Sequence, residues 1–437
     1  MKLLYLLSCS LIIVLAVHAE STASLDATNV EGKLSLDEVS RAALANNPAI
    51  KEAMRKWNAM KARIPQEVAW DDPKLSVNSS LARFIKVSPN AFTDQTWSIE
   101  QMIPLSGKNL SRARAAAAEA LATFEEARRQ QLDVLMKVRA SYFRLLNAYA
   151  QIELNRKNQV SLKQIADTSR SKYEVGTINA ADVLVAETEA NKLLETRRDL
   201  DRTLAAEQSQ LNVLIGRDAF TKLDEPKDED INFIALSVAK LRSLTLSNRP
   251  EVKVAEARVE SEKAMLQLAR REWIPDPTIS VQSQRYNNAA QAVSEVGAGI
   301  SFNVPWVNFK KYSAGVHEAD ENVGAAQLGL ERIQQEAIGL LRDALQKVET
   351  AHHHIELFRD KLVPVAQQAF DSNQLAYESG KVGFLDWITA QRNLRDLEAM
   401  ARQDLAEYQI AAAELEAVVG ADLHVFPSLS SARRPTQ

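Results

Sequence analysis

Residues 70–73 read Trp-Asp-Asp-Pro and residues 273–277 read Trp-Ile-Pro-Asp-Pro, so a short pattern occurs twice, about two hundred residues apart. Further landmarks recur in the same order at offsets of 201 to 204 residues: Asn47-Pro48 with Arg249-Pro250, Ile103-Pro104 with Val304-Pro305, Tyr173-Glu174-Val175-Gly176 with Tyr377-Glu378-Ser379-Gly380, and Leu214-Ile215-Gly216 with Val418-Val419-Gly420. A fixed period indicates a duplicated structural unit. The sequence therefore predicts a tandem repeat.

The duplication divides the chain into five segments. We expect a signal peptide at 1–19, a first repeat at 20–216, a charged linker in the equatorial region at 217–237, a second repeat at 238–420 and a C-terminal tail at 421–437. Each repeat has the order helix, strand, strand, long helix, return helix. The predicted helices are 36–69 (broken at Asn47-Pro48), 110–175 and 182–215, then 238–272, 310–377 and 383–419. Ser35 and Glu38 predict a capping box at the first helix.

Composition excludes several classes of protein. The chain has 437 residues, a formal net charge of −4, 13 glycines, 13 prolines and one cysteine. The slight negative charge argues against nucleic-acid binding, and the few glycines and prolines argue against a disordered chain. A single cysteine excludes a disulfide framework and a cysteine-based zinc site.

The first residues are typical of a secretory signal. Lys2 precedes an apolar stretch at 3–17, and Val17 and Ala19 supply small residues at positions −3 and −1 for cleavage before Glu20. The stretch is shorter than a membrane-spanning helix. A lipoprotein signal is disfavoured because Cys9 lies inside the apolar stretch.

The predicted strands alternate apolar and polar residues. The alternation covers 74–81 and 296–304, and shorter stretches around Trp97 and Ile279. Such a period over about ten residues is typical of a transmembrane β-strand, although a half-buried hairpin in a soluble sheet has the same pattern. Trp70 and Trp273 stand just before the strands, where aromatic residues mark a membrane interface. We therefore predict a membrane location.

The long helices are too long for a compact domain. Helix 110–175 would measure about 100 Å at 1.5 Å per residue, and each shorter helix about 50 Å. Two short helices stacked end to end therefore equal one long helix. A heptad-like seam supports a coiled coil: Leu132, Leu135, Tyr142, Leu145, Tyr149 and Ile152. An isolated dimeric coiled coil has the same seam, but it explains neither the strands nor the duplication.

Four strands per chain cannot close a membrane barrel, and an open sheet edge cannot face lipid. Three chains would supply twelve strands, enough for an aqueous lumen. Cyclic symmetry would close the ring without free edges. The predicted fold is thus mainly α with membrane β: a homotrimer with a twelve-stranded transmembrane β-barrel that continues as a long α-helical barrel.

The ordered landmarks resemble the outer-membrane efflux duct family of the TolC type. Residues 101–108, Gln-Met-Ile-Pro-Leu-Ser-Gly-Lys, resemble the strand-to-helix joint of its metal and multidrug efflux members. The resemblance implies a passive channel in the outer membrane with a periplasmic extension. It also implies two partners, a periplasmic adaptor (membrane fusion) protein and an inner-membrane pump of the RND type, with no cofactor.

In that family the turns after the long helices form a gated periplasmic tip. The matching residues are Tyr173, Gly176, Asp182, Tyr377, Gly380, Val382, Asp386 and Thr389. Asp182 and Asp386 are expected to cap the return helices. Asp386 matches one of the family's acidic gate residues and would face its copies on the symmetry axis. Where some members of the family have a basic residue and a second acidic residue, this chain has Val382 and Thr389, so the resemblance leaves open whether the gate is a salt-bridge latch.

Other functions have weaker support. His352, His353 and His354 point in different directions on a helix, so a solvated face is favoured over a metal site. No catalytic motif is visible, so an enzyme is not expected. A periplasmic coiled-coil adaptor or structural protein of an efflux or secretion assembly is the main alternative, but the second hairpin argues against it. Metal ions, drugs and polypeptides all stay open as cargo, with a lean toward metals from residues 101–108.

Overall fold

The structure is a computed structural model that describes residues 33–80, 94–228, 237–286, 293–421 and 423. Residues Leu34–Gln437 form one structural unit, and the description below concerns that unit. The predicted signal peptide 1–19 and most of the predicted tail 421–437 lie outside the described residues. Among the described residues, none of the helices combines the length and apolar content that crossing a bilayer requires.

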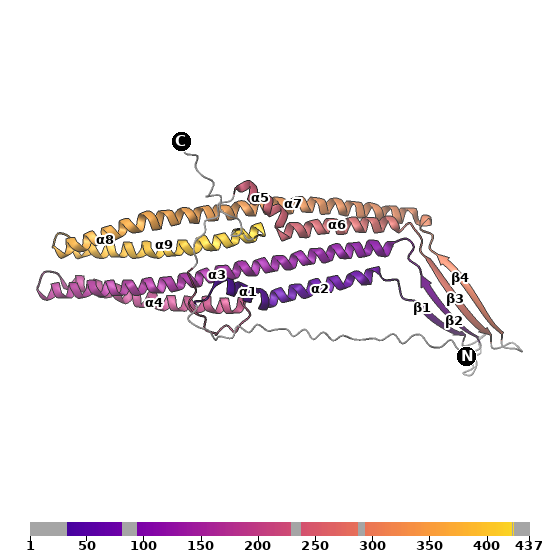
Figure 1. Cartoon of the computed structure of the whole chain (residues 1–437), viewed down its shortest axis with the longest axis horizontal. Helices are drawn as coiled ribbons and strands as arrows, with labels where there is room; N and C mark the ends of the chain where they lie inside the picture. Colours follow the sequence, from indigo (N-terminus) through magenta and orange to yellow (C-terminus); the bar gives the residue numbers. More distant parts are fainter. Residues whose placement is uncertain (1–32, 81–93, 229–236, 287–292, 422, 424–437) are drawn as a thin grey trace, which may run out of the picture. The chain divides into compact units, whose positions relative to one another are not determined.

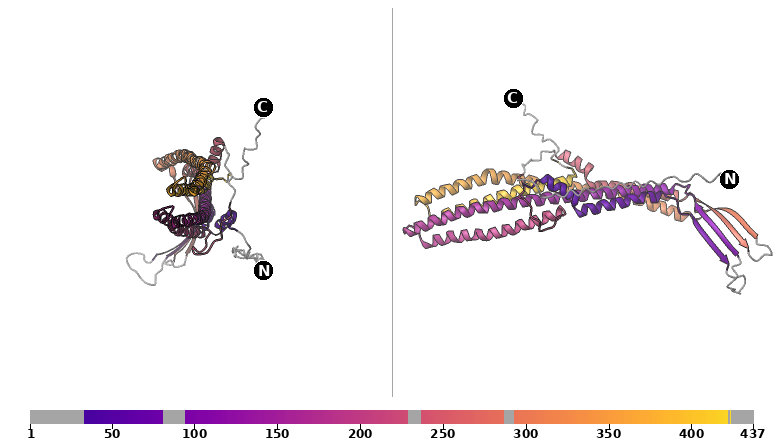
Figure 2. Two further views of the ribbon diagram at one scale, coloured as in Figure 1. Left: turned by 90° about the vertical axis from the view of Figure 1, so that its left-hand side faces the viewer. Right: turned by 60° about the horizontal axis from the view of Figure 1, so that its bottom comes forward.

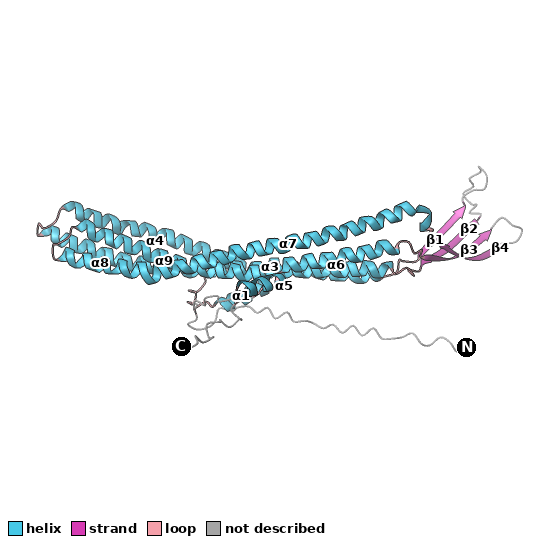
Figure 3. Cartoon of the chain, turned by 90° about the horizontal axis from the view of Figure 1, so that it is seen from above, coloured by secondary structure: helices cyan, strands magenta, loops and turns pink. Residues whose placement is uncertain are grey.

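Both halves of the unit follow the same order of elements. The first half contains α1 Leu36–Asn46, α2 Pro48–Val68, β1 Lys74–Ser80, β2 Asp94–Met102, α3 Lys108–Glu174 and α4 Ala180–Leu214. The second half contains α5 Val238–Asn248, α6 Pro250–Arg271, β3 Pro277–Tyr286, β4 Val293–Phe302, the 3₁₀ turn η1 Pro305–Asn308, α7 Phe309–Leu357, the π-helical turn η2 Phe358–Leu362, α8 Val363–Glu378 and α9 Phe384–Val419. The predicted mainly helical, duplicated chain is confirmed (Figure 3).

The helices run side by side along the long direction of the unit. α3 packs against α2 and α4, which follow one another along its length, and also against α6 and α9 (Figure 1). In the second half, α6 and α9 pack along α7, and α9 also packs on α8 (Figure 2). Two shorter helices therefore accompany each long helical segment, as the length comparison predicts.

The four strands form one antiparallel sheet in the order β1-β2-β3-β4 (Figure 1). β2 pairs with β3, so the sheet joins the two repeats. One row of paired residues runs across the sheet from Leu75 to Ile99, Val281 and Ala298. Because paired residues share a face, this face is apolar. Its large side chains are exposed: Leu75, Val77, Trp97, Ile99, Ile279, Val281, Val296 and Ile300.

The opposite face of the sheet is polar. Its rows pair Ser76 with Ser98, Gln282 and Gly297, and Asn78 with Thr96, Gln284 and Glu295. The sheet therefore separates an apolar surface from a polar one.

The middle of the unit holds a repeated joint between helix ends. The Asn47 side-chain amide donates to the Leu214 carbonyl at 2.8 Å, and the Arg249 guanidinium donates to the Val418 carbonyl at 2.9 Å. The return helices end next to these contacts, at glycines with φ of +74°. The landmarks Asn/Arg-Pro and the terminal glycine thus recur together because they build one joint.

The linker is attached to this joint. Leu34 pairs with Pro226 in a parallel β-bridge, and the Leu34 amide donates to the Glu225 carbonyl at 2.9 Å. The Tyr142 hydroxyl lies 2.8 Å from the carbonyl oxygens of both Leu34 and Lys227 and can donate to one of them at a time. Tyr142 is fully buried in a cluster with Val134, Val138 and Leu145.

One local prediction is wrong and two are confirmed in part. Of the predicted seam of α3, Tyr142 and Leu145 are buried in the core, whereas Leu132 and Leu135 are only half-buried. Val134 and Val138 lie in the core instead, because the core contacts neighbours on several sides of the helix. Ser35 precedes α1 but makes no side-chain capping bond. Finally, the predicted helix 310–377 is helical throughout, from Phe309 to Glu378, but it contains the π-helical turn η2, which has no counterpart in α3.

Candidate functional site

The two turns between the long and return helices are built alike. Gly176 and Gly380 adopt φ of +74° and +73°, which glycine tolerates because it has no side chain. The amide of Thr177 donates to the Lys172 carbonyl at 2.9 Å, and the amide of Lys381 to the Ala376 carbonyl at 2.8 Å. These bonds close each long helix in a Schellman-type turn. The two helical hairpins, α3–α4 and α8–α9, therefore end in similar tips.

The second tip packs against the first hairpin through an aromatic cluster. Tyr377 is 3% exposed and stacks on Trp387 with ring centroids 4.8 Å apart, while Phe384 meets its ring edge-on at 6.1 Å. Lys172 of α3 places its ammonium 4.0 Å from the centre of the Tyr377 ring and donates to the Tyr377 carbonyl at 2.7 Å. Val382 packs against the same cluster.

Burial raises the pKa of Tyr377, and the negative charge of Asp182 adds to this rise. The predicted site residues Tyr377 and Val382 therefore belong to one cluster.

The first tip lacks such a partner within the described chain. Tyr173 is the counterpart of Tyr377 but is 48% exposed, and Leu184, the counterpart of the fully buried Ile388, is 61% exposed. Equivalent residues of the two repeats therefore differ in exposure: Tyr377 and Ile388 are buried within the chain, whereas Tyr173 and Leu184 are exposed to solvent.

The two acidic residues differ in their contacts. Asp386 is exposed, and its carboxylate accepts from the Gly383 amide at 3.2 Å, which caps α9. Asp182 also stands in the first turn of its helix, but the N-cap of α4 receives no side-chain bond. Thr389 is exposed, and its hydroxyl donates to the Leu385 carbonyl at 2.6 Å. The capping role is thus realised for Asp386 only.

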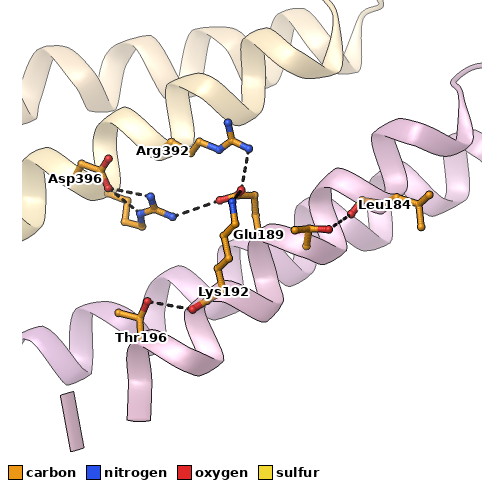
Figure 4. A network of polar contacts seen from close by, with 8 residues as sticks. Leu184, Glu189, Lys192, Thr196, Arg392 and Asp396 are labelled. Atoms are coloured by element: carbon orange, nitrogen blue, oxygen red, sulfur yellow. Dashed lines mark hydrogen bonds and ion pairs between the residues drawn. The ribbon is translucent and has the colours of Figure 1, made fainter. Parts of the chain in front are cut away.

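A polar network links the hairpins about two helical turns from the tips (Figure 4). Glu189 of α4 is the centre: its carboxylate is 4% exposed and lies 2.9 Å from the Arg392 guanidinium and 3.8 Å from that of Arg395, both on α9. Lys192 contacts Glu189 at 2.6 Å from the same helix, and Asp396 holds Arg395 at 2.9 Å. The network therefore ties α4 to α9 by charge.

Burial alone would raise the pKa of Glu189, but the charges and hydrogen bonds of Lys192 and Arg392 outweigh it, and its pKa is lowered. The carboxylate is thus ionised at neutral pH. A cavity of about 490 Å³ adjoins the network and is lined by α3, α4 and α9, with Asn155 and Asn158 among its polar walls.

Sequence reasoning missed this network. Glu189 and Arg392 lie 203 residues apart, and each resembles an ordinary surface charge on a helix. No local pattern distinguishes them, because the ion pair depends on how the two hairpins pack.

A second polar site lies where the helices meet the sheet. Asp276, just before β3, accepts from the Ser106 amide at 2.7 Å and from the Ser106 hydroxyl at 2.8 Å, and the Lys108 ammonium lies 3.1 Å away. Gly107 adopts φ of +73° beside Arg271, whose guanidinium donates to the Gly107 carbonyl at 2.9 Å. The segment 101–108 of one repeat is thus fastened to the Asp-Pro pair of the other.

The two predicted interface tryptophans lie at the same end. Trp70 is 59% exposed, whereas Trp273 is half-buried against Phe309 and Tyr312, with ring centroids 5.3 and 5.6 Å apart. Both precede strands whose exposed face is apolar.

The three adjacent histidines, His352 to His354, lie on α7. Within the described part of the chain, no three histidine, cysteine, aspartate or glutamate side chains gather closely enough to hold a metal ion.

Two long helical hairpins attached to a sheet with one exposed apolar face fit a protein of the outer membrane. The family model described as outer membrane efflux protein matches residues 39–217 and 241–421. The chain therefore belongs to the outer membrane efflux protein family, which confirms the predicted family and outer-membrane location and favours an outer-membrane protein over the periplasmic adaptor alternative.

Named relatives agree with this assignment. The probable efflux pump outer membrane protein SepC of Pseudomonas putida is 26% identical over 312 residues, covering 69% of this chain and 63% of SepC. The cobalt-zinc-cadmium resistance protein CzcC of Cupriavidus metallidurans is 23% identical over 396 residues, covering 89% of this chain and 90% of CzcC.

The cation efflux system protein CusC of Escherichia coli is 23% identical over 299 residues, covering 66% of this chain and 63% of CusC. A solved structure of CusC superposes with a TM-score of 0.75 at 18% identity, covering 91% of this chain and 96% of that chain. The fold is therefore shared, while the chain spans 63% of the length of SepC and of CusC in sequence.

Proposed function

We propose that three copies of this chain form a channel-tunnel that passively conducts solutes from the periplasm to the exterior. The strands would close a twelve-stranded β-barrel in the outer membrane, and the helices would continue it as a tunnel into the periplasm. One observation carries the proposal: the sheet has an exposed apolar face, a polar face and two edge strands, β1 and β4, each paired on one side in the described chain.

The physical argument is backbone satisfaction. In lipid, unpaired amides and carbonyls of an edge strand cost several kcal/mol each, on the order of the penalty for burying an unpaired polar group. Pairing β1 of one copy with β4 of the next removes both edges. The apolar face would then meet lipid and the polar face the lumen.

The open first hairpin supports the same assembly. Tyr377 and Ile388 are covered by the first hairpin of their own chain, whereas Tyr173 and Leu184 are exposed. In a ring of alternating hairpins, the second hairpin of a neighbouring copy would cover the latter pair.

Trp70 and Trp273 would lie at the periplasmic membrane interface, where aromatic residues are enriched. The hairpin tips would form the gate and the docking end for a periplasmic adaptor and an inner-membrane pump of the RND type, which supplies the energy. The names of CzcC and CusC favour metal ions among the possible cargoes.

The gate would combine two elements. Asp386 of each copy would ring the aperture and attract cations, and their apparent pKa values would belong to the coupled set. Glu189 with Arg392 would hold the hairpins of one copy together in the closed state.

Single-channel recording in planar bilayers tests the proposal. Asp386→Asn keeps a side chain that can cap α9 but removes the charge. We expect it to weaken divalent-cation block at least several-fold, whereas Asp182→Asn serves as the matched first-tip control. If conductance and divalent-cation block are unchanged in Asp386→Asn, the only role of Asp386 is to cap α9. A purified protein without channel activity would refute the conduit.

A further inference from the structure

The second long helix differs from the first at one place, η2. The Phe358 amide is shared between the carbonyls of His354 and Ile355, and the Val363 amide reaches back five residues to the Phe358 carbonyl. α3 has no such interruption over its 67 residues. A π-helical turn inside an α-helix often marks a functional site.

A titratable contact adjoins this turn. The His354 Nδ1 atom lies 3.7 Å from Oδ1 of Asp404 on α9, and the His354 ring meets the Phe358 ring edge-on at 6.3 Å. The Asp404 side chain is 13% exposed, and its Oδ2 atom is buried without a hydrogen-bond partner among the described residues. The same residue, His354, thus accepts an α-helical bond from the first residue of η2 and lies next to a buried carboxylate.

When it is protonated, His354 is the main positively charged partner of the Asp404 carboxylate. Burial raises the pKa of Asp404, the charge of Glu407 on its own helix adds to the rise, and His354 opposes it. In η2, Arg359 and Asp360 pair with each other at 2.7 Å. His352 lies 4.0 Å from Glu356, and its ring is 6.2 Å from that of Tyr408.

We propose that η2 is a hinge of the second hairpin and that protonation of His354 fastens it through the ion pair with Asp404. Histidine is the side chain whose charge ordinarily changes between pH 5 and 8. When His354 is neutral, the Asp404 carboxylate stays buried without full compensation, and the one of the α7–α9 contacts that adjoins η2 weakens, while the hydrophobic contacts between the two helices stay. Acid therefore stiffens the hinge and neutral pH loosens it.

Because η2 lies a whole helix away from the tip, a small rotation at η2 moves the tip by several ångströms. α8 extends from Val363 to Glu378, so the tip lies about 24 Å beyond η2. A rotation of about 10° at η2 would displace the tip by about 4 Å over that length. This consequence rests on the proposed gate, whereas the hinge itself does not.

Hydrogen exchange of the full-length protein in detergent tests the hinge without measuring transport. Amide protection in 355–366 is compared at pH 5.5 and 7.5 after correction for the intrinsic exchange rate. We expect protection to fall about tenfold at pH 7.5 in the wild type. His354→Gln and Asp404→Asn should abolish the pH dependence, and His354→Arg should give high protection at both pH values.

His353→Gln is the matched control, because His353 is the exposed neighbour and should keep the wild-type response. The hinge is refuted if the wild type shows no pH dependence or if His354→Gln retains it. A protein that shows the expected exchange but no conductance would refute the proposed channel and leave the hinge in place.

Discussion

At the scale of single residues, the repeated joint depends on two glycines that each adopt a left-handed backbone conformation and also leave room for the backbone of a neighbouring helix. Gly216 and Gly420 both have φ of +74°, and a Cβ atom would lie 3.0 Å from the Asn46 carbonyl oxygen or 2.9 Å from that of Asn248. Gly176 has the same φ but open space around it. A left-handed conformation costs a non-glycine residue about 1–2 kcal/mol, and contact with backbone adds to that cost.

We therefore predict that Gly216→Ala and Gly420→Ala each destabilise the protein by about 3 kcal/mol, and Gly176→Ala by about 1 kcal/mol. Thermal melting followed by circular dichroism checks the order. Equal losses for all three variants would show that the contacts with Asn46 and Asn248 contribute nothing.

Asp276 gives a pH-dependent prediction. Burial would raise its pKa, but hydrogen bonds from Ser106 and Lys108 outweigh this, so its pKa lies below the ordinary value of 3.8. A lowered pKa means that the carboxylate stabilises the fold at neutral pH and that this contribution is lost as the pH falls through the lowered value. Asp276→Asn should cost about 2 kcal/mol at pH 7.

The difference between wild type and Asp276→Asn should shrink when melting is repeated near pH 3. A difference that stays constant between the two pH values would contradict an ionised Asp276. Asp72→Asn, at the matching position of the first repeat, is the control.

At the scale of elements, the tie between α4 and α9 depends on one buried carboxylate. Removing one partner of a buried ion pair costs about 3 kcal/mol because the remaining charges stay unpaired. Glu189→Gln should therefore loosen the hairpins near the tip and speed amide exchange in 386–396. It should also raise single-channel conductance if the tip is the gate.

Lys192→Gln is the matched control for Glu189→Gln. Lys192 contacts Glu189 within α4 and its side chain is 64% exposed, so its loss should cost no more than about 0.5 kcal/mol. If both variants exchange at the same rate near the tip, the contact with Arg392 does not hold the hairpins together.

Helices, turns and strands were predictable from the sequence where a residue type restricts the backbone conformation or where an alternating pattern marks a strand. Pro48 and Pro250 end the opening helices, Gly176 and Gly380 mark the turns, and alternation marks the strands. The π-turn lies just before Pro364, which has no amide to bond back to Asp360 and whose ring disfavours an α-helical turn there, so the sequence held a signal that the prediction of an unbroken helix 310–377 did not use. By contrast, Glu189 and Arg392 meet only after the hairpins pack, so no sequence pattern identifies them.

At the scale of the whole molecule, the asymmetry between the repeats yields a prediction about assembly. Tyr173 is exposed in the single chain. In a closed ring it should be covered by a neighbouring copy, so Tyr173→Cys should react with a maleimide at least tenfold more slowly in the assembled protein than after unfolding. The native sequence has one cysteine, Cys9, within the predicted signal peptide.

Asp199→Cys, at a site 70% exposed on the side chain in the single chain, is the labelling control. Equal labelling of Tyr173→Cys before and after unfolding would mean that no second hairpin covers the first.

The pairing of β1 with β4 between copies is the claim on which the tunnel depends. A protein carrying both Leu75→Cys and Ala298→Cys has one cysteine on each edge strand and can be treated with a short flexible bis-maleimide in membranes. We predict covalent products of two and three chains with none larger, and no more than two chains for either single variant. Products that stop at one chain, or a ladder beyond three, would contradict the closed trimer.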